Sequence, residues 1–220
     1  MCKNRPYLRD ERKSGLIQNI EKQKMEIKIR KRPLAFTDVE TTGLESIRWQ
    51  QPWYFPFIKT PRQWHEIIEL GLVLADQETL EILNTLNIKI KPEHPERLTE
   101  SALKTNGYNA EDWHNAVSLK TAMEKYGELT KDAIFCAQNP TFDWSFIDAA
   151  FKKTGTPDLM DYHRIDLFTL AWGKLFHTNL ERFNQDMVAE FLGFPKEPLP
   201  HRAISGAMMA YENYKKLISR

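Results

Sequence analysis

The order of the apolar segments constrains the fold of this chain more than any other feature. Residues 34–39 form a short apolar run, and residues 66–75 and 81–91 form two longer runs rich in Ile, Leu and Val. A short turn at Asp76-Gln77-Glu78 separates the last two runs, which predicts a β-hairpin. Residues 133–137 form a fourth, uniformly apolar run whose length is typical of a buried strand.

Helical patterns dominate the second half of the chain. Turn and capping residues bound several of them, such as Gly107 and Gly155 after two expected helix ends. The predicted helices cover residues 99–105, 112–126, 142–153, 165–176, 185–192 and 201–218. Three strands, followed by a strand that alternates with helices, imply an α/β fold with a mixed sheet flanked by helices.

The first 32 residues are interpreted as a basic N-terminal arm, partly helical over residues 16–29, ahead of a domain formed by residues 33–220. The arm holds eleven Lys or Arg residues against four Asp or Glu, a net charge of +7, whereas the whole chain carries +1. This asymmetry indicates a phosphate-rich partner. The alternative is a solvated extension that only aids solubility.

Residues 45–64 are an aromatic insertion. We expect a long loop there, because its prolines disfavour a regular helix or a central strand. The insertion contains Trp49, Trp53, Tyr54, Phe55, Phe57 and Trp64, interleaved with Arg48, Lys59 and Arg62. Aromatic rings beside cations suit stacking on single-stranded bases. The alternative is a small satellite core or a protein-binding patch.

The two cysteines and the absence of long apolar runs bear on the compartment. Cys136 lies in an apolar strand-like run and Cys2 in the basic arm, so they do not resemble a disulfide framework. No apolar run approaches the length that crosses a membrane, and the N-terminus has no apolar signal segment. We therefore expect a cytoplasmic protein that has no membrane partner.

The first candidate site follows the first predicted strand. Asp38 and Glu40 are two residues apart, so both carboxylates point to one face of the strand. Side by side they repel each other unless a cation that prefers oxygen ligands neutralises them. The alternative is that both simply face water. Thr41, Thr42 and Gly43 come next and offer hydroxyls and a bare backbone to a phosphate or ribose.

Asp143 and His201 mark two further candidate sites. Asp143 starts a predicted helix just after the buried strand, where α/β sheets usually bind ligands. An acid that only stabilises the helix dipole is the alternative. His201 starts another helix after a Pro-rich loop, where it can act as a general base near neutral pH. A solvent-facing or capping histidine is the alternative.

Together these segments resemble the motifs of the DEDDh 3′→5′ exonucleases, the DnaQ-like family. The matching residues, in the family's order, are Asp38-x-Glu40-Thr41-Thr42-Gly43-Leu44, Asn139-x-x-Phe142-Asp143-x-x-Phe146 and His201-Arg202-Ala203. Asp166 resembles a further family aspartate, with an ordinary helix cap as the alternative. The resemblance covers roughly residues 33–218 and implies an RNase H-like, mixed five-stranded sheet flanked by helices.

The resemblance also implies a two-metal site for Mg²⁺ or Mn²⁺. Asp38, Glu40 and Asp143 would be the metal ligands, and His201 would take the proton from the attacking water. The residues expected to contact the substrate are Thr41, Thr42, Gly43, Leu44, Asn139, Phe142 and Phe146. The implied reaction is hydrolysis of phosphodiester bonds at the 3′ end of single-stranded or frayed DNA, or of RNA.

Gly206 departs from the family pattern. Five residues after the histidine the family has a carboxylate, whereas this chain has a glycine. The loss is expected to weaken metal binding and activation of the water. Three explanations stay open: a natural relative of low or no activity, a substituted form of an active enzyme, or a ligand from elsewhere, such as Asp166 or the substrate phosphate.

The motifs therefore predict a metal-dependent 3′→5′ exonuclease that acts on a single-stranded DNA or RNA 3′ end. A polymerase or another replication protein is a candidate partner. The alternative, which the glycine at position 206 favours, is a catalytically weak or inactive nucleic-acid-binding or polymerase-associated module.

Overall fold

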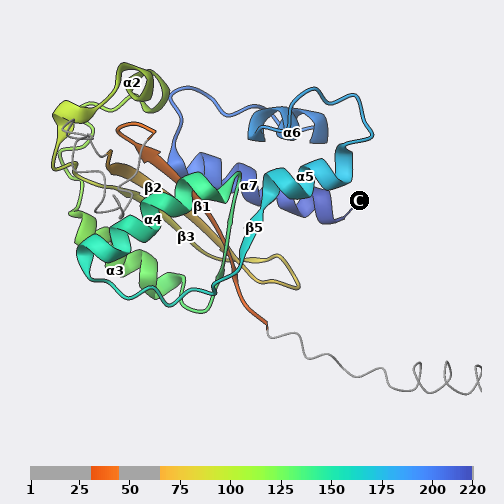
Figure 1. Cartoon of the computed structure of the whole chain (residues 1–220), viewed down its shortest axis with the longest axis horizontal. Coiled ribbons are helices and arrows are strands. Elements are labelled where there is room, and N and C mark those ends of the chain that lie inside the picture. The colour runs from red at the N-terminus through yellow and green to blue at the C-terminus, as the bar shows by residue number, and fades with distance from the viewer. Residues whose placement is uncertain (1–30, 45–64, 220) are drawn as a thin grey trace, which may run out of the picture. The chain divides into compact units, whose positions relative to one another are not determined.

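The computed structural model describes residues 31–44 and 65–219. The chain divides into two compact units, Met1–Lys31 and Arg32–Arg220. The helix expected over residues 16–29 and the aromatic insertion over residues 45–64 lie outside the described residues. All the helices and strands given below belong to the second unit, whose described residues are drawn in colour in Figure 1.

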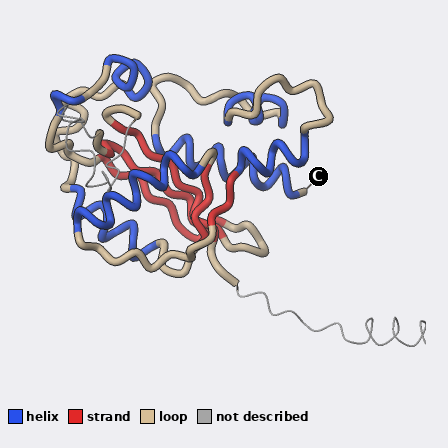
Figure 2. The backbone as a smooth tube through the Cα atoms, in the orientation of Figure 1, coloured by secondary structure: helices blue, strands red, loops and turns tan. Residues whose placement is uncertain are grey.

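A mixed five-stranded sheet forms the centre of this unit, as predicted (Figures 1 and 2). Its strands are β1 (Leu34–Thr41), β2 (Ile67–Ala75), β3 (Ile82–Lys89), β4 (Ile134–Ala137) and β5 (Arg164–Asp166). Their order is β3-β2-β1-β4-β5; β2 runs antiparallel to β1 and β3, whereas β4 runs parallel to β1 and β5. The carboxyl ends of β1 and β4 therefore meet at one edge, where such sheets bind ligands.

Helices cover both faces of the sheet. They are α2 (Glu100–Asn106), α3 (Leu119–Leu129), α4 (Pro140–Thr154), α5 (Leu167–Leu175), α6 (Gln185–Leu192) and α7 (Ala203–Ile218), with a 3₁₀ turn at Pro95–Arg97. α3 and α4 share one core with Ala35 and Val39 of β1. α7 packs on the opposite face, where the rings of Phe36 and Tyr211 lie 5.5 Å apart. α5 and α6 pack in turn against α7.

Alternation along β1 determines which side chains reach which face. Leu34 and Phe36 enter the core beneath α7, whereas Ala35 enters the core beneath α3 and α4. Asp38 and Glu40 continue the first series, so both carboxylates lie on the face that α7 covers. The two acids therefore share one face of the strand, as their spacing predicts.

The helix predicted over residues 112–126 is wrong at its start. α3 begins at Leu119, where the Ser118 hydroxyl accepts the Thr121 N–H at 3.1 Å. Upstream of this cap, the buried Trp113 donates its indole N–H to the backbone oxygen of Ile68 at 2.8 Å. Burial of this ring against β2 holds the segment before α3 in turns. This is a tertiary effect that local helix propensity does not reveal.

The helix predicted over residues 165–176 is also wrong at its start. Arg164–Asp166 instead pairs with β4 as the edge strand β5. Asp166 then caps α5, because its Oδ1 accepts the Phe168 N–H at 3.0 Å and its Oδ2 accepts the Thr169 hydroxyl at 2.5 Å. A strand of three residues is too short to show a periodic pattern.

The other helix predictions are confirmed with small shifts at the ends. α4 begins two residues before the predicted start, α6 has the predicted bounds and α7 begins two residues later. α7 has 16 residues. No helix in the described ranges combines the length and the hydropathy that crossing a membrane requires.

Candidate active site

One cavity of about 310 Å³ gathers the residues that the sequence predicts to be catalytic. β1 supplies two of them, the first turn of α4 supplies the third, and the fourth lies just before α7. We call the cavity and its acids the carboxylate site. Its walls are formed by Asp38, Glu40, Asp143 and His201, together with Val39, Thr105, Gln138, Phe142, Asn184, Gln185, Asp186 and Glu197.

A backbone contact fixes Asp143 against β1. After β4, Asn139 adopts a left-handed conformation with φ 55°, and α4 begins at Pro140. This turn carries Asp143 over the end of the strand, where its Oδ1 accepts the Val39 N–H at 3.1 Å. The carboxylate of α4 is thereby held beside those of β1.

Burial makes the carboxylate site electrostatically unusual. Burial raises the pKa of Asp38 well above its ordinary value, and the neighbouring Asp143 and Glu40 raise it further. Burial also raises the pKa of Glu40 to about 8 and that of Asp143 to about 7. Such carboxyl groups hold protons near neutral pH unless a cation replaces those protons. Hard oxygen donors in this number, removed from water, fit a divalent ion such as Mg²⁺ or Mn²⁺.

His201 is anchored by the loop that leads into α7. Its backbone N–H donates to the Thr105 oxygen at 2.8 Å, which ties this loop to α2. Its Nδ1 lies 3.8 Å from Oε2 of Glu197, and 31% of its side chain is exposed. The imidazole is therefore positioned by protein contacts while part of it stays open to solvent, as a general base acting on water requires.

A neighbouring cavity of about 210 Å³ contains several residues expected to contact the substrate. Leu44 is 80% exposed beside it. Phe142 lines both this cavity and the carboxylate site, so its ring forms a shared wall. The walls are formed by Val39, Glu40, Thr41, Gly43, Leu44, Thr99, Ser101, Ala102, Thr105, Asn106 and Phe142.

Three other residues predicted to contact the substrate lie outside these two cavities. Thr42 is buried, and its hydroxyl accepts the Glu66 N–H at 2.9 Å. Phe146 is buried with its ring 5.2 Å from that of Phe142. Asn139 is exposed at the start of α4. Thr42 and Phe146 are therefore placed to support the residues that line the two cavities.

Gly206 points toward the carboxylate site from the first turn of α7. A Cβ atom at this position would lie 2.6 Å from Oδ2 of Asp38, which is closer than van der Waals packing allows. Position 206 therefore faces the Asp38 carboxylate. The missing side chain leaves this space to Asp38 itself.

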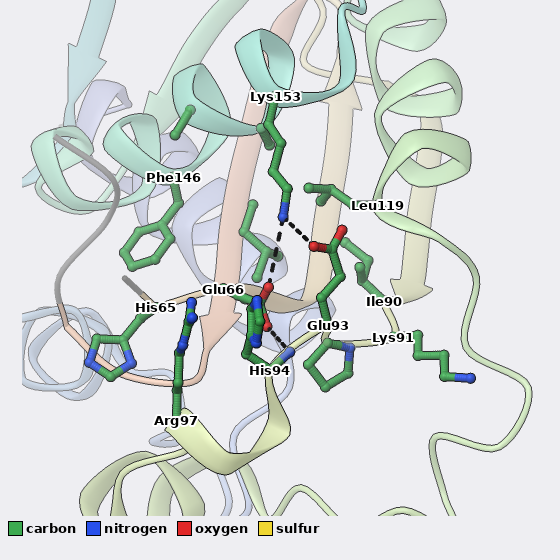
Figure 3. A pocket seen from close by; sticks show the side chains of 14 residues that line it. His65, Glu66, Ile90, Lys91, Glu93, His94, Arg97, Leu119, Phe146 and Lys153 are labelled. Atoms are coloured by element: carbon green, nitrogen blue, oxygen red, sulfur yellow. Dashed lines mark hydrogen bonds and ion pairs between the residues drawn. The ribbon is translucent and has the colours of Figure 1, made fainter. Parts of the chain in front are cut away.

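A third cavity, of about 320 Å³, contains a second group of acids (Figure 3). Glu66, Glu93 and His94 each place one potential ligand atom within 4.8 Å of the others. Lys153 reaches into this group, with its Nζ 2.8 Å from Glu93 and 3.8 Å from Glu66. We call these four residues the lysine-bridged cluster. Its ammonium group pairs with both carboxylates and offsets one of their two charges, so a metal ion would compete with it.

Two acids near the site are absent from the sequence-based prediction. Glu197 lines the carboxylate site, and Glu69 is the cross-strand partner of Glu40. The side chain of Glu69 is buried and lies 3.6 Å from the guanidinium of Arg202. A charged residue inside the apolar run of β2 is a signal that could have revealed Glu69. Glu197 lies in a Pro-rich loop, four residues before His201, and this position gives only a weak signal in the sequence.

Sequence comparison places the chain among known proteins. The sequence profile of the exonuclease family (RNase_T) matches residues 35–214, which include all the site residues above. The chain belongs to this exonuclease family. A relative from Caldanaerobacter subterraneus subsp. tengcongensis, a DNA polymerase III of the PolC type, is 27% identical over 183 residues, which are 83% of this chain and 11% of the polymerase.

A second PolC-type DNA polymerase III, from Pediococcus pentosaceus, gives a similar match. It is 27% identical over 167 residues, which are 76% of this chain and 10% of the polymerase. The exonuclease-family chain thus spans about a tenth of the length of these curated relatives.

Solved structures show the same fold. The nuclease domain of 3′hExo, a DEDDh family member bound to rAMP, matches with a TM-score of 0.65 and 16% identity over 87% of this chain and 94% of that domain. E. coli exonuclease I in complex with a 5cy-dT13 oligonucleotide matches with a TM-score of 0.66 and 14% identity over 87% of this chain and 41% of that protein. The prediction of an RNase H-like fold is confirmed.

Proposed function

We propose that this chain is a metal-dependent 3′→5′ exonuclease that acts on single-stranded or frayed DNA, with RNA as the alternative substrate. The observation that carries the proposal is the gathering of Asp38, Glu40 and Asp143 beside His201 in one cavity. Membership of the exonuclease family supports hydrolysis of a nucleic acid. The adjoining cavity beside Leu44 and Phe142 offers space for a terminal base.

The carboxylates of β1 and α4 would hold Mg²⁺ or Mn²⁺, because oxygen donors with raised pKa values exchange their protons for such a cation. When bound, divalent ions stabilise the negative charge on the transferring phosphate, the attacking oxygen and the leaving 3′ oxygen.

The side chains supply positioning and proton transfer. Leu44 packs against the terminal base and Phe142 closes the space beside it, which orients the last phosphodiester over the carboxylates. His201 accepts at Nε2 the proton of the water that attacks phosphorus. The bond between phosphorus and the 3′ oxygen of the preceding nucleotide then breaks. That oxygen takes a proton from solvent and becomes the new 3′ hydroxyl, and a nucleoside 5′-monophosphate leaves the shortened strand.

A 5′-labelled oligonucleotide incubated with the chain and Mn²⁺ tests this proposal. The expected result is a ladder of products that shorten from the 3′ end. His201→Gln should slow shortening by about 10²–10⁴-fold, because it removes the proton acceptor. Glu93→Gln, in the lysine-bridged cluster, is the matched control and should leave the rate unchanged. Parallel DNA and RNA substrates decide which sugar is preferred.

Gly206 favours a second candidate function, a nucleic-acid-binding or polymerase-associated module of little activity. The PolC-type relatives support a polymerase as the partner in that case. Retardation of the labelled strand on a native gel, with no shortening in Mn²⁺, would replace the first proposal with this one.

A further inference from the structure

Glu197 brings an additional carboxylate to the carboxylate site. It lies on the loop between α6 and α7 and lines the same cavity as Asp38 and Glu40. Its side chain is only 9% exposed, although the residue belongs to a surface loop. A carboxylate withdrawn from water inside a cavity of other carboxylates is costly unless the group is held there and neutralised.

Contacts on both sides hold Glu197 in this position. Its backbone N–H donates to Oδ1 of Asp186 at 3.2 Å, which joins the loop to α6. Its Oε1 accepts the backbone N–H of Arg202 at 3.1 Å, and its Oε2 lies 3.8 Å from Nδ1 of His201. The carboxylate is therefore fixed at the start of α7, next to the histidine of the site.

An acid at position 206 would require the Asp38 carboxylate to move. The Cβ atom that such a residue would need lies 2.6 Å from Oδ2 of Asp38. With glycine at position 206, a fourth carboxylate at this site comes from another part of the chain.

Asp166 does not supply that carboxylate. Its Oδ1 accepts the N–H groups of Phe168 and Asn139, and its Oδ2 accepts the hydroxyl of Thr169. Asp186 lines the cavity, but its Oδ1 is engaged with the backbone of Glu197. These bonds assign the first residue to capping α5 and the second to positioning the loop.

The electrostatics agree with a direct role for Glu197. After burial, its negative charge is the largest cause of the raised pKa of Glu40, and it also raises the pKa of Asp38. Glu197 therefore belongs to the same charged group as the acids of β1.

We propose that Glu197 is the fourth carboxylate of the metal site and supplies from the loop before α7 the charge that Gly206 lacks. The inference rests on the proposed metal-dependent exonuclease. It makes Glu197 a ligand, together with Asp38 and Glu40, of a cation that would lie next to His201.

Binding of Mn²⁺ to the full chain without nucleic acid, measured by calorimetry, tests this assignment independently of cleavage. Glu197→Gln keeps an oxygen for the Arg202 N–H and removes only the charge. If Glu197 is a ligand, this change should weaken Mn²⁺ binding by more than the about 10–100-fold typical for loss of a residue that only orients a ligand. Glu197→Asp restores the charge on a shorter side chain and should recover part of the affinity. Glu190→Gln is the matched control, since Glu190 on α6 is 58% exposed and pairs with Lys196 at 3.2 Å.

Unchanged Mn²⁺ affinity in Glu197→Gln, together with weakened binding in Asp38→Asn, would overturn the assignment and leave the proposed exonuclease standing. A wild-type chain that binds Mn²⁺ through Glu197 but shortens no oligonucleotide would overturn the exonuclease and keep the metal ligand. A wild-type chain that binds no Mn²⁺ would overturn both. Circular dichroism of each variant checks that loss of binding does not come from loss of the fold.

Discussion

The carboxylate site and the lysine-bridged cluster use similar residues to opposite effect. Both bring acids and a histidine together around a cavity. In the cluster, Glu93 is 59% exposed and Lys153 lies 2.8 Å from it, so water and an ammonium group screen the charge. In the carboxylate site, Glu40 and Asp143 are buried, and burial, followed by the charges of Asp143 and Glu40, raises the pKa of Asp38.

The difference shows that the number of acids does not define a metal site. Three ligand atoms lie within 4.8 Å of one another in the lysine-bridged cluster, whereas the carboxylate site gathers its acids around one cavity and buries them. Only in the carboxylate site does burial make ionisation of the acids costly unless a cation accompanies it. The comparison can be tested by changing burial and neutralisation separately in the two regions.

The largest expected effect comes from the carboxylate site. Because of its acids, the free energy of unfolding should depend on pH and on bound metal. The pKa of Glu40 is raised to about 8 from 4.5. Well below pH 4.5, the Glu40 carboxyl is protonated in both the folded and the unfolded chain. As the pH rises toward 8, the unfolded chain releases its proton first, so the folded state loses stability. In EDTA this loss should be on the order of 3 kcal/mol.

Urea unfolding at pH 5 and pH 8, with EDTA or with Mn²⁺, measures this effect. Mn²⁺ should stabilise the fold more at pH 8, because its ligands must be deprotonated. Glu40→Gln should reduce both the loss of stability with pH in EDTA and the gain from Mn²⁺. Glu93→Gln should retain both. Equal pH dependence in the wild type and Glu40→Gln would show that Glu40 ionises freely in the folded state.

A smaller effect should distinguish two glycines that lie in helices. Gly206→Ala places a methyl group against Asp38 and should destabilise the fold by about 1–3 kcal/mol, as overpacking does. A methyl group at Gly173 in α5 would meet no heavy atom of the described residues within 4 Å, apart from its own helix and chain neighbours. Gly173→Ala should therefore stabilise the fold by about 0.5–1 kcal/mol through helix propensity.

Thermal or urea unfolding of the two alanine variants measures this difference directly. Opposite signs are expected for the two changes in unfolding free energy. A stabilising Gly206→Ala would mean that the Asp38 carboxylate moves aside easily, and the packing argument for glycine at position 206 would then fail.

The sequence predicted the fold best where apolar runs are long. The hairpin of β2 and β3 and the helix α6 follow from pattern and turn residues, with shifts of at most two residues at their ends. β5 was not predicted, because Arg164–Asp166 is a strand only through its pairing with β4. The start of α3 was predicted wrongly, because Trp113 is buried through a hydrogen bond to Ile68, which lies far away in the sequence.

The sequence predicted the candidate site where a carboxylate directly follows an apolar segment. Asp38 and Asp143 lie at such ends, and the fold brings them to one cavity. Glu197 lies on a loop whose course depends on hydrogen bonds to Asp186 and Arg202, so its position could not be derived from spacing. Thr42 was expected to offer its hydroxyl to a phosphate or ribose. In the structure this hydroxyl accepts the Glu66 N–H, a partner that the sequence does not reveal.

The smallest expected effect concerns the lysine-bridged cluster. Lys153→Met removes the ammonium group but keeps most of the side chain. The change in unfolding free energy should be below about 1 kcal/mol, because ion pairs with this exposure are weak. Shortening of an oligonucleotide should stay at the wild-type rate, because the cluster is separate from the carboxylate site.

The same variant tests whether neutralisation is what separates the two regions. Without its lysine, the group formed by Glu66, Glu93 and His94 keeps its ligand spacing and loses its internal cation. Calorimetry should then detect one additional, weak Mn²⁺ site, and adding Glu93→Gln should remove it. If Lys153→Met gains no site, exposure alone prevents metal binding there, and burial would be the property that makes the carboxylates of β1 and α4 a metal site.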